Sequence, residues 1–205
     1  MVRFLKKGLS VGVDLAGAES RNTGVASLDM FLQLESAVLH KDGEILEYLL
    51  DKDPEVILID APLSLPKGRK SLERRSKIHF RECDLELRRR HIPFFPITLG
   101  PMRKLTSRGI RLARILRSKG FAVFEGYPGA AQDLMSIPRK GVSKDLLSAG
   151  LRRIGLRIED GATHDELDAV TIAYVGLLHL RGKSELIGNV EEGQIMLPLA
   201  TEKSE

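Results

Sequence analysis

The sequence of 205 residues contains one cysteine and no long apolar run. Because Cys83 is the only cysteine, an internal disulfide and a cysteine-based metal cluster are excluded, which fits a reducing compartment. The sequence has no stretch of about 18 uncharged apolar residues, the length that a membrane-spanning helix needs. Its first residues also lack the apolar stretch and cleavage site of a secretory signal. We therefore expect a soluble, cytoplasmic protein without a membrane partner, while its oligomeric state stays open.

Internal repeats, low-complexity tracts and linkers are also missing, apart from a short polar tail after Pro198. With 42% hydrophobic residues, a chain of this length can bury one sizeable core. The patterns predict three strands, a helix, a strand, two helices, a strand, two helices and a terminal hairpin. This order predicts a single α/β domain over residues 1–205.

Positive charge is concentrated in one segment of the chain. The net charge is only +4, yet residues 67–90 hold ten Lys and Arg residues against four Asp and Glu. We expect a long basic helix at 71–90, inside an insert that spans 67–106. A basic face suits a polyanion because each neutralised phosphate releases counterions. The charges fit equally well an ordinary solvated helix with i,i+4 pairs.

Three predicted strands end on or near an acidic residue: Asp14, Asp60 and Glu125. We expect these strands to be parallel neighbours, joined by right-handed crossovers. Parallel strands place their carboxyl ends at the same edge, which is where open α/β sheets bind ligands. The three carboxylates are therefore predicted to converge.

The segment "THDELDAVTIAYVGLLHL" predicts a further helix with three acids near its start, Asp165, Glu166 and Asp168. Thr163 and Glu166 form a capping-box pattern, so Asp165 could simply complement the helix dipole. From Leu167 onward the helix is apolar on almost every side, which predicts that Asp168 lies at the core. A buried carboxylate must be protonated, paired with a base or bound to a cation.

Together these acids predict a divalent metal site. Hard carboxylate oxygens, with no cysteine ligands, favour Mg²⁺ or Mn²⁺. Two such ions about 3.5–4 Å apart can activate a water and stabilise the leaving oxygen of a phosphodiester. With the basic segment, this indicates phosphoryl chemistry on nucleic acid, either DNA or RNA. The candidate catalytic and metal-binding residues are Asp14, Asp60, Glu125, Asp165 and Asp168.

The motifs "VGVDLAG", "ILIDAPLSLP", "RECD", "FFPITLGPMRKLTSRGIRL", "FEGYPGAAQ" and "THDELDAVTIAY" resemble those of domain-of-unknown-function family 429 (DUF429). This family is a predicted nuclease group of the ribonuclease-H-like superfamily, and the resemblance covers nearly the whole chain. It implies a five-stranded mixed sheet with the first three strands antiparallel and helices on both faces. It also implies a divalent-metal-dependent nuclease.

The resemblance assigns roles to the same acids. Asp14 would be the central metal ligand of the superfamily, Asp60 the acid of the "DAP" motif and Glu125 the acid before "YP". Asp165 and Asp168 match the acids of the C-terminal helix. The basic insert and the "FFPITLGPM" loop depart from the simplest ribonuclease H layout, which argues against simple cleavage of RNA:DNA hybrids.

Within the insert, we expect four basic side chains to hold backbone phosphates and the "FFPITLGPM" loop to lie over the metal site. The alternative is that Arg81 pairs with Asp84. Phe94 and Phe95 are expected to be core anchors. The predicted phosphate-binding residues are Arg74, Arg75, Lys77 and Arg81.

Two other functions fit parts of the pattern. A nucleotide phosphotransferase of the actin-like type also holds Mg²⁺ on a strand-end Asp, but it needs a second, similar half that the chain has no room for. A non-catalytic nucleic-acid-binding module on the same fold would keep the basic surface and bind without metal. An intact set of acids favours the nuclease over this module.

Overall fold

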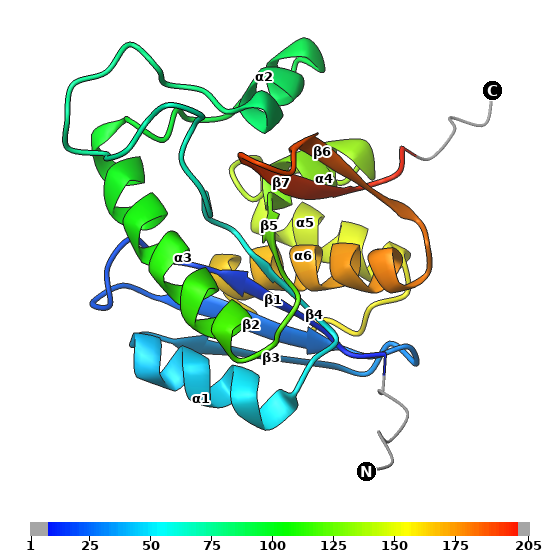
Figure 1. Ribbon diagram of the computed structural model, residues 1–205. Helices are drawn as coiled ribbons and strands as arrows, with labels where there is room; N and C mark the ends of the chain where they lie inside the picture. The colour runs from blue at the N-terminus through cyan, green and yellow to red at the C-terminus, as the bar shows by residue number, and fades with distance from the viewer. Residues whose placement is uncertain (1–7, 201–205) are drawn as a thin grey trace.

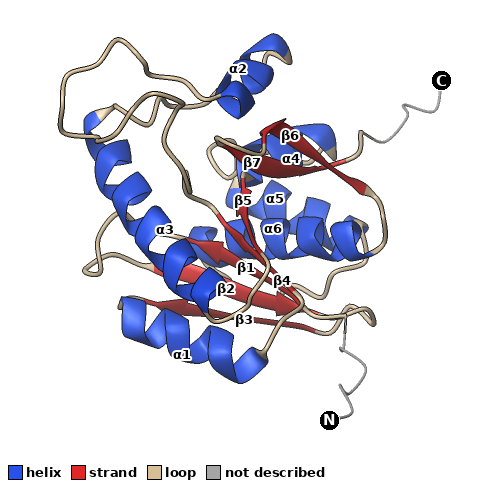
Figure 2. Ribbon diagram, viewed as in Figure 1, coloured by secondary structure: helices blue, strands red, loops and turns tan. Residues whose placement is uncertain are grey.

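The computed structural model describes residues 8–200, which form a seven-stranded sheet with helices on both faces (Figures 1 and 2). Residues 1–7, which bear on the expected absence of a secretory signal, and the polar tail at 201–205 lie outside this range. The strands are β1 Ser10–Asp14, β2 Thr23–Leu28, β3 Leu34–Leu39, β4 Val56–Ile59, β5 Val123–Gly126, β6 Ser184–Asn189 and β7 Gly193–Pro198. The helices are α1 Asp42–Lys52, α2 Glu82–Arg89, α3 Gly100–Ser118, α4 Pro128–Leu134, α5 Lys144–Arg153 and α6 His164–Leu180.

The strand order across the sheet is β3-β2-β1-β4-β5-β7-β6. Strands β1, β2 and β3 pair antiparallel with one another, whereas β4, β5 and β7 continue the sheet parallel to β1. This confirms a mixed α/β sheet with β1, β4 and β5 as parallel neighbours. The expected number of five strands is wrong, because the predicted C-terminal hairpin joins the same sheet through pairing of β7 with β5.

The core lies in two layers, because successive strand residues point to opposite faces. On one face, Val11, Val13, Ile57 and Ile59 pack against α1 and α3. On the other face, apolar residues of β2 and β4 pack against α6, with α5 joining it under β2. Figure 1 shows α1 and α3 together on one side of the sheet and α6 on the other.

Helix α6 packs directly on the backbone of the sheet. A Cβ atom on Gly12 of β1 would lie 2.1 Å from the carbonyl oxygen of Ala169. One on Gly24 of β2 would lie 2.0 Å from the carbonyl oxygen of Asp165. Only glycine permits this approach. It brings the first turns of α6, with Asp165 and Asp168, beside the carboxyl end of β1.

The prediction of a long basic helix at 71–90 is wrong for the first half of this segment. Only α2, at the end of this segment, is helical. The buried guanidinium of Arg69 donates hydrogen bonds to the carbonyl oxygens of Leu72, Arg74 and Ile78. Because these carbonyl groups bond to a side chain, they favour an irregular loop over a helical hydrogen-bond ladder.

The sequence pattern does not indicate helix α4. It predicts that a strand is broken after Glu125, and β5 does end at Gly126, but Pro128 then begins a short helix, at a position that proline favours. The pattern predicts a helix from about Thr106 to Lys119, whereas α3 begins at Gly100 and also has a proline in its first turn. Among residues 8–200, no helix is long and apolar enough to cross a membrane.

Candidate functional site

Asp14 and Asp60 lie side by side at the carboxyl edge of the sheet. Asp14 is the last residue of β1, and Asp60 directly follows β4, its parallel neighbour. The backbone N–H of Asp60 donates a hydrogen bond of 2.8 Å to the carbonyl oxygen of Val13. The hydrogen bonds of the sheet therefore hold the backbones of Asp14 and Asp60 next to each other, as their positions at the strand ends predicted.

Asp168 joins this pair from α6 and is almost fully buried. Its Oδ1 atom accepts a hydrogen bond of 2.8 Å from Nε2 of Gln132 on α4. The same amide nitrogen lies 3.2 Å from the hydroxyl oxygen of Thr171, which donates to the carbonyl oxygen of Leu167. This buried network fixes the orientation of the Asp168 carboxylate and leaves Oδ2 facing the other acids.

A lysine that the sequence pattern did not indicate completes the cluster. Nζ of Lys140 lies 2.6 Å from Oδ2 of Asp168 and 3.5 Å from Oδ2 of Asp14. Lys140 belongs to the loop between α4 and α5, and its side chain is 41% exposed. A single lysine in a polar loop carries no pattern that could have indicated this position.

The acids of the cluster are partly removed from water, which strengthens the repulsion between their negative charges. The pKa of Asp14 is raised to about 7, chiefly because its carboxyl group is buried; the charge of Lys140 lowers this pKa, and the charges of Asp168 and Asp165 raise it. Burial also raises the pKa of Asp60, and the nearby charges of Asp14 and Asp168 raise it further. The pKa of Lys140 would be lowered by its burial, but the surrounding carboxylates raise it overall. Added positive charge would therefore stabilise the cluster.

Glu125 does not join the other acids, although its strand brings it to the same edge. Both of its carboxylate oxygens bond to Arg81, at 2.6 Å from Nη1 and 2.8 Å from Nη2. Oε2 also accepts a hydrogen bond from the backbone N–H of Leu63. These partners occupy the carboxylate, so we omit Glu125 from the proposed metal ligands.

The expectation that Arg81 binds phosphate is wrong. Its side chain is 2% exposed and pairs with Asp84 as well as Glu125. Burial alone would lower the pKa of Arg81, but the two carboxylates raise it well above its usual value. Asp84 also accepts the backbone N–H of Arg81 and so caps the start of α2. The alternative interpretation, that Arg81 pairs with Asp84, is confirmed.

The donor set of the remaining acids fits a hard divalent cation. Asp14 and Asp168 both lie within 4 Å of the Lys140 ammonium, Asp60 is next to Asp14 at the same edge, and Asp165 lines the adjoining cavity with Asp14 and Lys140. Among residues 8–200, no group of three or more His, Cys, Asp or Glu side chains already has the geometry of a metal site. A cation would have to displace the ammonium of Lys140, which is partly exposed and sits on a loop. His164, next to Asp165, is exposed.

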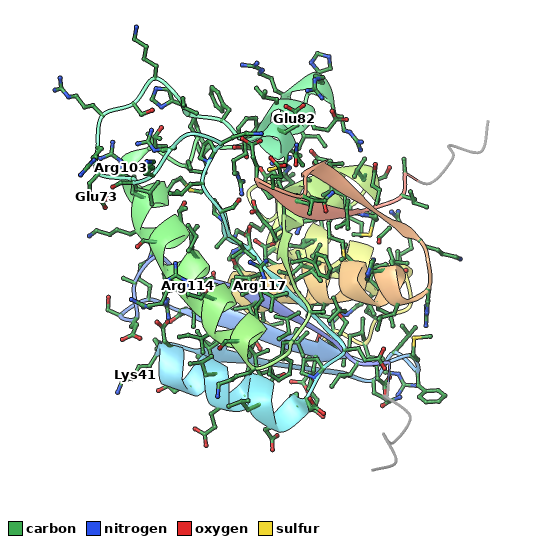
Figure 3. All side chains as sticks on the ribbon, in the orientation of Figure 1. Lys41, Glu73, Glu82, Arg103, Arg114 and Arg117 are labelled. Atoms are coloured by element: carbon green, nitrogen blue, oxygen red, sulfur yellow. The ribbon has the colours of Figure 1, made fainter. Side chains whose placement is uncertain are left out.

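Three adjoining cavities lead away from the acid cluster. The first, of about 500 Å³, contains Asp14 and extends to Gly17. The second, of about 310 Å³, begins at Gly17 and includes Arg103, Lys104 and Arg111 of α3. The third, of about 540 Å³, is lined by the loop at 67–81 and shares Arg103 with the second. Figure 3 shows Arg103 and Glu73 together where this loop meets α3.

We name this run of side chains the basic surface: Arg74, Arg75, Lys77, Arg103, Lys104 and Arg111, all of which are exposed. The first three were predicted, and the structure places them on a loop. The three from α3 were not predicted, although α3 has six basic residues and no acidic one, because the denser segment at 67–90 dominates the charge pattern.

The two phenylalanines of the loop at 91–99 have different environments. Phe94 is partly buried, packs against the cluster around Leu87 and Ile195, and makes an edge contact with Phe80. Phe95 is 69% exposed. The expectation of a core anchor is therefore wrong for Phe95.

The fold and site define a mixed α/β protein with clustered carboxylates at the carboxyl edge of its parallel strands. The chain belongs to the family described as "Protein of unknown function (DUF429)", whose model matches residues 12–192. This confirms the family that the motifs indicated. No curated protein matches the chain significantly. A Thermus thermophilus RuvC structure is similar at 14% identity and a TM-score of 0.45, over 85% of this chain and 96% of that one.

Proposed function

We propose that this protein is a divalent-metal-dependent nuclease that hydrolyses phosphodiester bonds in DNA or RNA. The observation that carries the proposal is the convergence of Asp14, Asp60 and Asp168 at the carboxyl edge of the sheet, with one ammonium between Asp14 and Asp168. Three neighbouring carboxylates with one ammonium leave negative charge that a divalent cation would balance.

In this proposal, Asp14 and Asp60 hold Mg²⁺ or Mn²⁺ from two neighbouring strands, and Asp168 holds it from α6. Asp165 lines the same cavity as Asp14 and adds a fourth carboxylate. A metal ion held there would polarise the phosphodiester and lower the pKa of an attacking water. Gln132 supports the chemistry by fixing the Asp168 carboxylate, because it bonds to the oxygen that faces away from the cation position.

The basic surface supports nucleic acid as the substrate. Its six cationic side chains line two cavities that continue from the acid cluster, so a bound strand could extend from one to the other. Along α3, Arg103 and Arg111 are about 12 Å apart at 1.5 Å per residue, a span that covers several backbone phosphates. Repeated cations at this spacing suit a polyanion better than a single small anion.

The order of the first five strands supports a ribonuclease-H-like fold as well. Strands β1 to β3 form an antiparallel unit, followed by β4 and β5 in parallel. We interpret the hairpin β6–β7 as an extension of this sheet. Helix α2 and its flanking loops then form the insert at 67–106, within a single domain. The expected cytoplasmic location stays a prediction.

The experiment is a cleavage screen with Mn²⁺ on labelled single-stranded, duplex and branched DNA and RNA. We expect cleavage by the wild type and none by Asp14→Asn. Asp51→Asn removes an exposed acid on α1 and is the matched control, which should retain full activity. Equal cleavage by the wild type and Asp14→Asn would refute the assignment.

A non-catalytic nucleic-acid-binding module is the second candidate. It is favoured by the Lys140 ammonium between the acids and by the complete pairing of Glu125 with Arg81. In that case, binding of nucleic acid would survive both EDTA and Asp14→Asn, with no cleavage under any metal. The nuclease proposal predicts cleavage that EDTA abolishes.

A further inference from the structure

A small apolar pocket lies beside the acid cluster and is separate from the cavities of the basic surface. Asp60 lies at its rim, and its volume is about 170 Å³. Its walls come from the loop at 91–99, from α3 and from the end of β5, through Phe94, Phe95, Met102, Leu105 and Tyr127. Neither the motifs nor the metal site accounts for this pocket.

The exposed ring of Phe95 is the feature of this pocket that most needs an explanation. Among the described residues 8–200, no aromatic ring or cationic side chain stacks on Phe95. By contrast, Phe94 in the same loop packs against Phe80 and the core. An exposed aromatic ring at the mouth of an apolar pocket offers a stacking surface to a ligand.

The size and position of the pocket limit what it can hold. An apolar cavity of about 150 Å³ accommodates one benzene molecule, so a pocket of this size accommodates one six-membered aromatic ring. Met102 and Leu105 line both this pocket and the cavity that contains Asp14. A group bound here would therefore be a close neighbour of a phosphate at the acid cluster.

We propose that this pocket, with Phe95 as its stacking surface, binds one unpaired pyrimidine base of the nucleic acid next to the phosphate at the acid cluster. The inference rests on the proposed function. It narrows the substrate to nucleic acid that has an unpaired base at the cleavage site. Of the three acids at the pocket, Asp84 and Glu125 already share the guanidinium of Arg81, and Asp60 belongs to the proposed metal site.

Recognition in this pocket is mainly by stacking. Tyr127 donates its hydroxyl to the carbonyl oxygen of Pro93, and Arg139 lies over its ring, so its polar end is already engaged. Stacking on an aromatic ring tolerates every base that fits, because each base has a π-face. The pocket therefore selects a base by two properties: the base is unpaired, and its ring is small enough to fit.

The test uses fluorescence anisotropy with two end-labelled probes, an oligothymidylate and the same backbone with abasic sugars. Ca²⁺ replaces Mn²⁺, and a gel checks that the probes stay intact. We expect the wild type to prefer oligothymidylate by about 5- to 100-fold. Phe95→Ala should lose most of this preference without changing its affinity for the abasic probe, while Phe95→Trp should keep it.

Phe31→Ala is the matched control. Phe31 is 82% exposed and lies in the turn after Leu28, which pairs with Ser10 at the opposite end of β1 from Asp14. This variant should behave as the wild type. If Phe95→Ala keeps the full preference, or the wild type binds both probes equally, the base pocket is refuted and the nuclease proposal stands. If the wild type binds neither probe at low salt, the base pocket is refuted too, and the cleavage screen alone decides the nuclease proposal.

Discussion

Nζ of Lys140 lies 2.6 Å from Oδ2 of Asp168, at the position where we propose that a divalent cation binds. The same nitrogen is 3.5 Å from Oδ2 of Asp14. A partly exposed ammonium on a loop can balance the carboxylates without metal and could be displaced when metal binds. The lysine and the metal ion would therefore compete for the same acids.

This competition predicts the effect of removing the lysine. In Lys140→Ala, no ammonium has to be displaced, so the dissociation constant for Mn²⁺ should fall by about tenfold or more, since each 1.4 kcal/mol corresponds to a factor of ten. Isothermal titration calorimetry of both proteins measures this constant. Lys144→Ala, at the start of α5, is the control and should leave it unchanged. Weaker Mn²⁺ binding by Lys140→Ala would show that the lysine supports the site.

The raised pKa of Asp14 predicts how stability depends on pH without metal. Its pKa is 3.8 in the unfolded chain and about 7 in the folded protein, so the folded state holds the proton more tightly. The stability that this proton contributes is present below pH 4 and is lost as pH rises to 7. Asp14→Asn has no carboxyl group to titrate at this position, so the variant does not lose this stability as pH rises. In EDTA, the free energy of unfolding of Asp14→Asn, relative to that of the wild type, should be larger at pH 8 than at pH 5 by roughly 2–3 kcal/mol.

Urea denaturation at the two pH values measures this difference. Asp51→Asn is the control, since its side chain is exposed on α1, and its effect should be the same at both values. A pH-independent effect of Asp14→Asn would mean that Asp14 is ionised in the folded protein across this range.

Much of the fold follows from local patterns in the sequence, and so do three members of the acid cluster. Asp14 and Asp60 could be placed because strand ends define an edge, and Asp168 because an apolar helix has to be buried. Lys140 and the pairing of Arg81 with Glu125 could not be placed, because each depends on contacts between distant segments. The loop at 67–81 has a helical composition, yet Arg69 binds its carbonyl groups, and such a tertiary contact overrides propensity.

The pairing of Arg81 predicts a structural role that can be separated from nucleic-acid binding. Arg81→Met leaves Glu125 and Asp84 buried without their cation, so the free energy of unfolding should fall by about 3–5 kcal/mol. Adding Glu125→Gln should recover part of this loss, because the amide carries no charge. Urea denaturation of the single and double variants measures both effects. A single variant as stable as the wild type would contradict the role of the buried pair.

The basic surface predicts a change in salt dependence. Reversing two charges with Arg74→Glu and Arg75→Glu should weaken nucleic-acid binding. It should also reduce the slope of log affinity against log salt by about 0.7 for each single-strand phosphate that the protein no longer neutralises. Lys119→Glu with Lys183→Glu is the matched control, since both residues are exposed at the far ends of α3 and α6. An unchanged slope in the Arg74 and Arg75 variant would remove these residues from the interface.

The central claim is that Asp14, Asp60 and Asp168 form a divalent metal site, and thermal melting with Mn²⁺ tests it without knowledge of the substrate. Binding to the folded state alone raises the midpoint, so millimolar Mn²⁺ should raise that of the wild type by about 5 °C. It should leave Asp14→Asn unmoved and shift Asp51→Asn as much as the wild type. Equal shifts in the wild type and Asp14→Asn, or no shift in either, would contradict the claim.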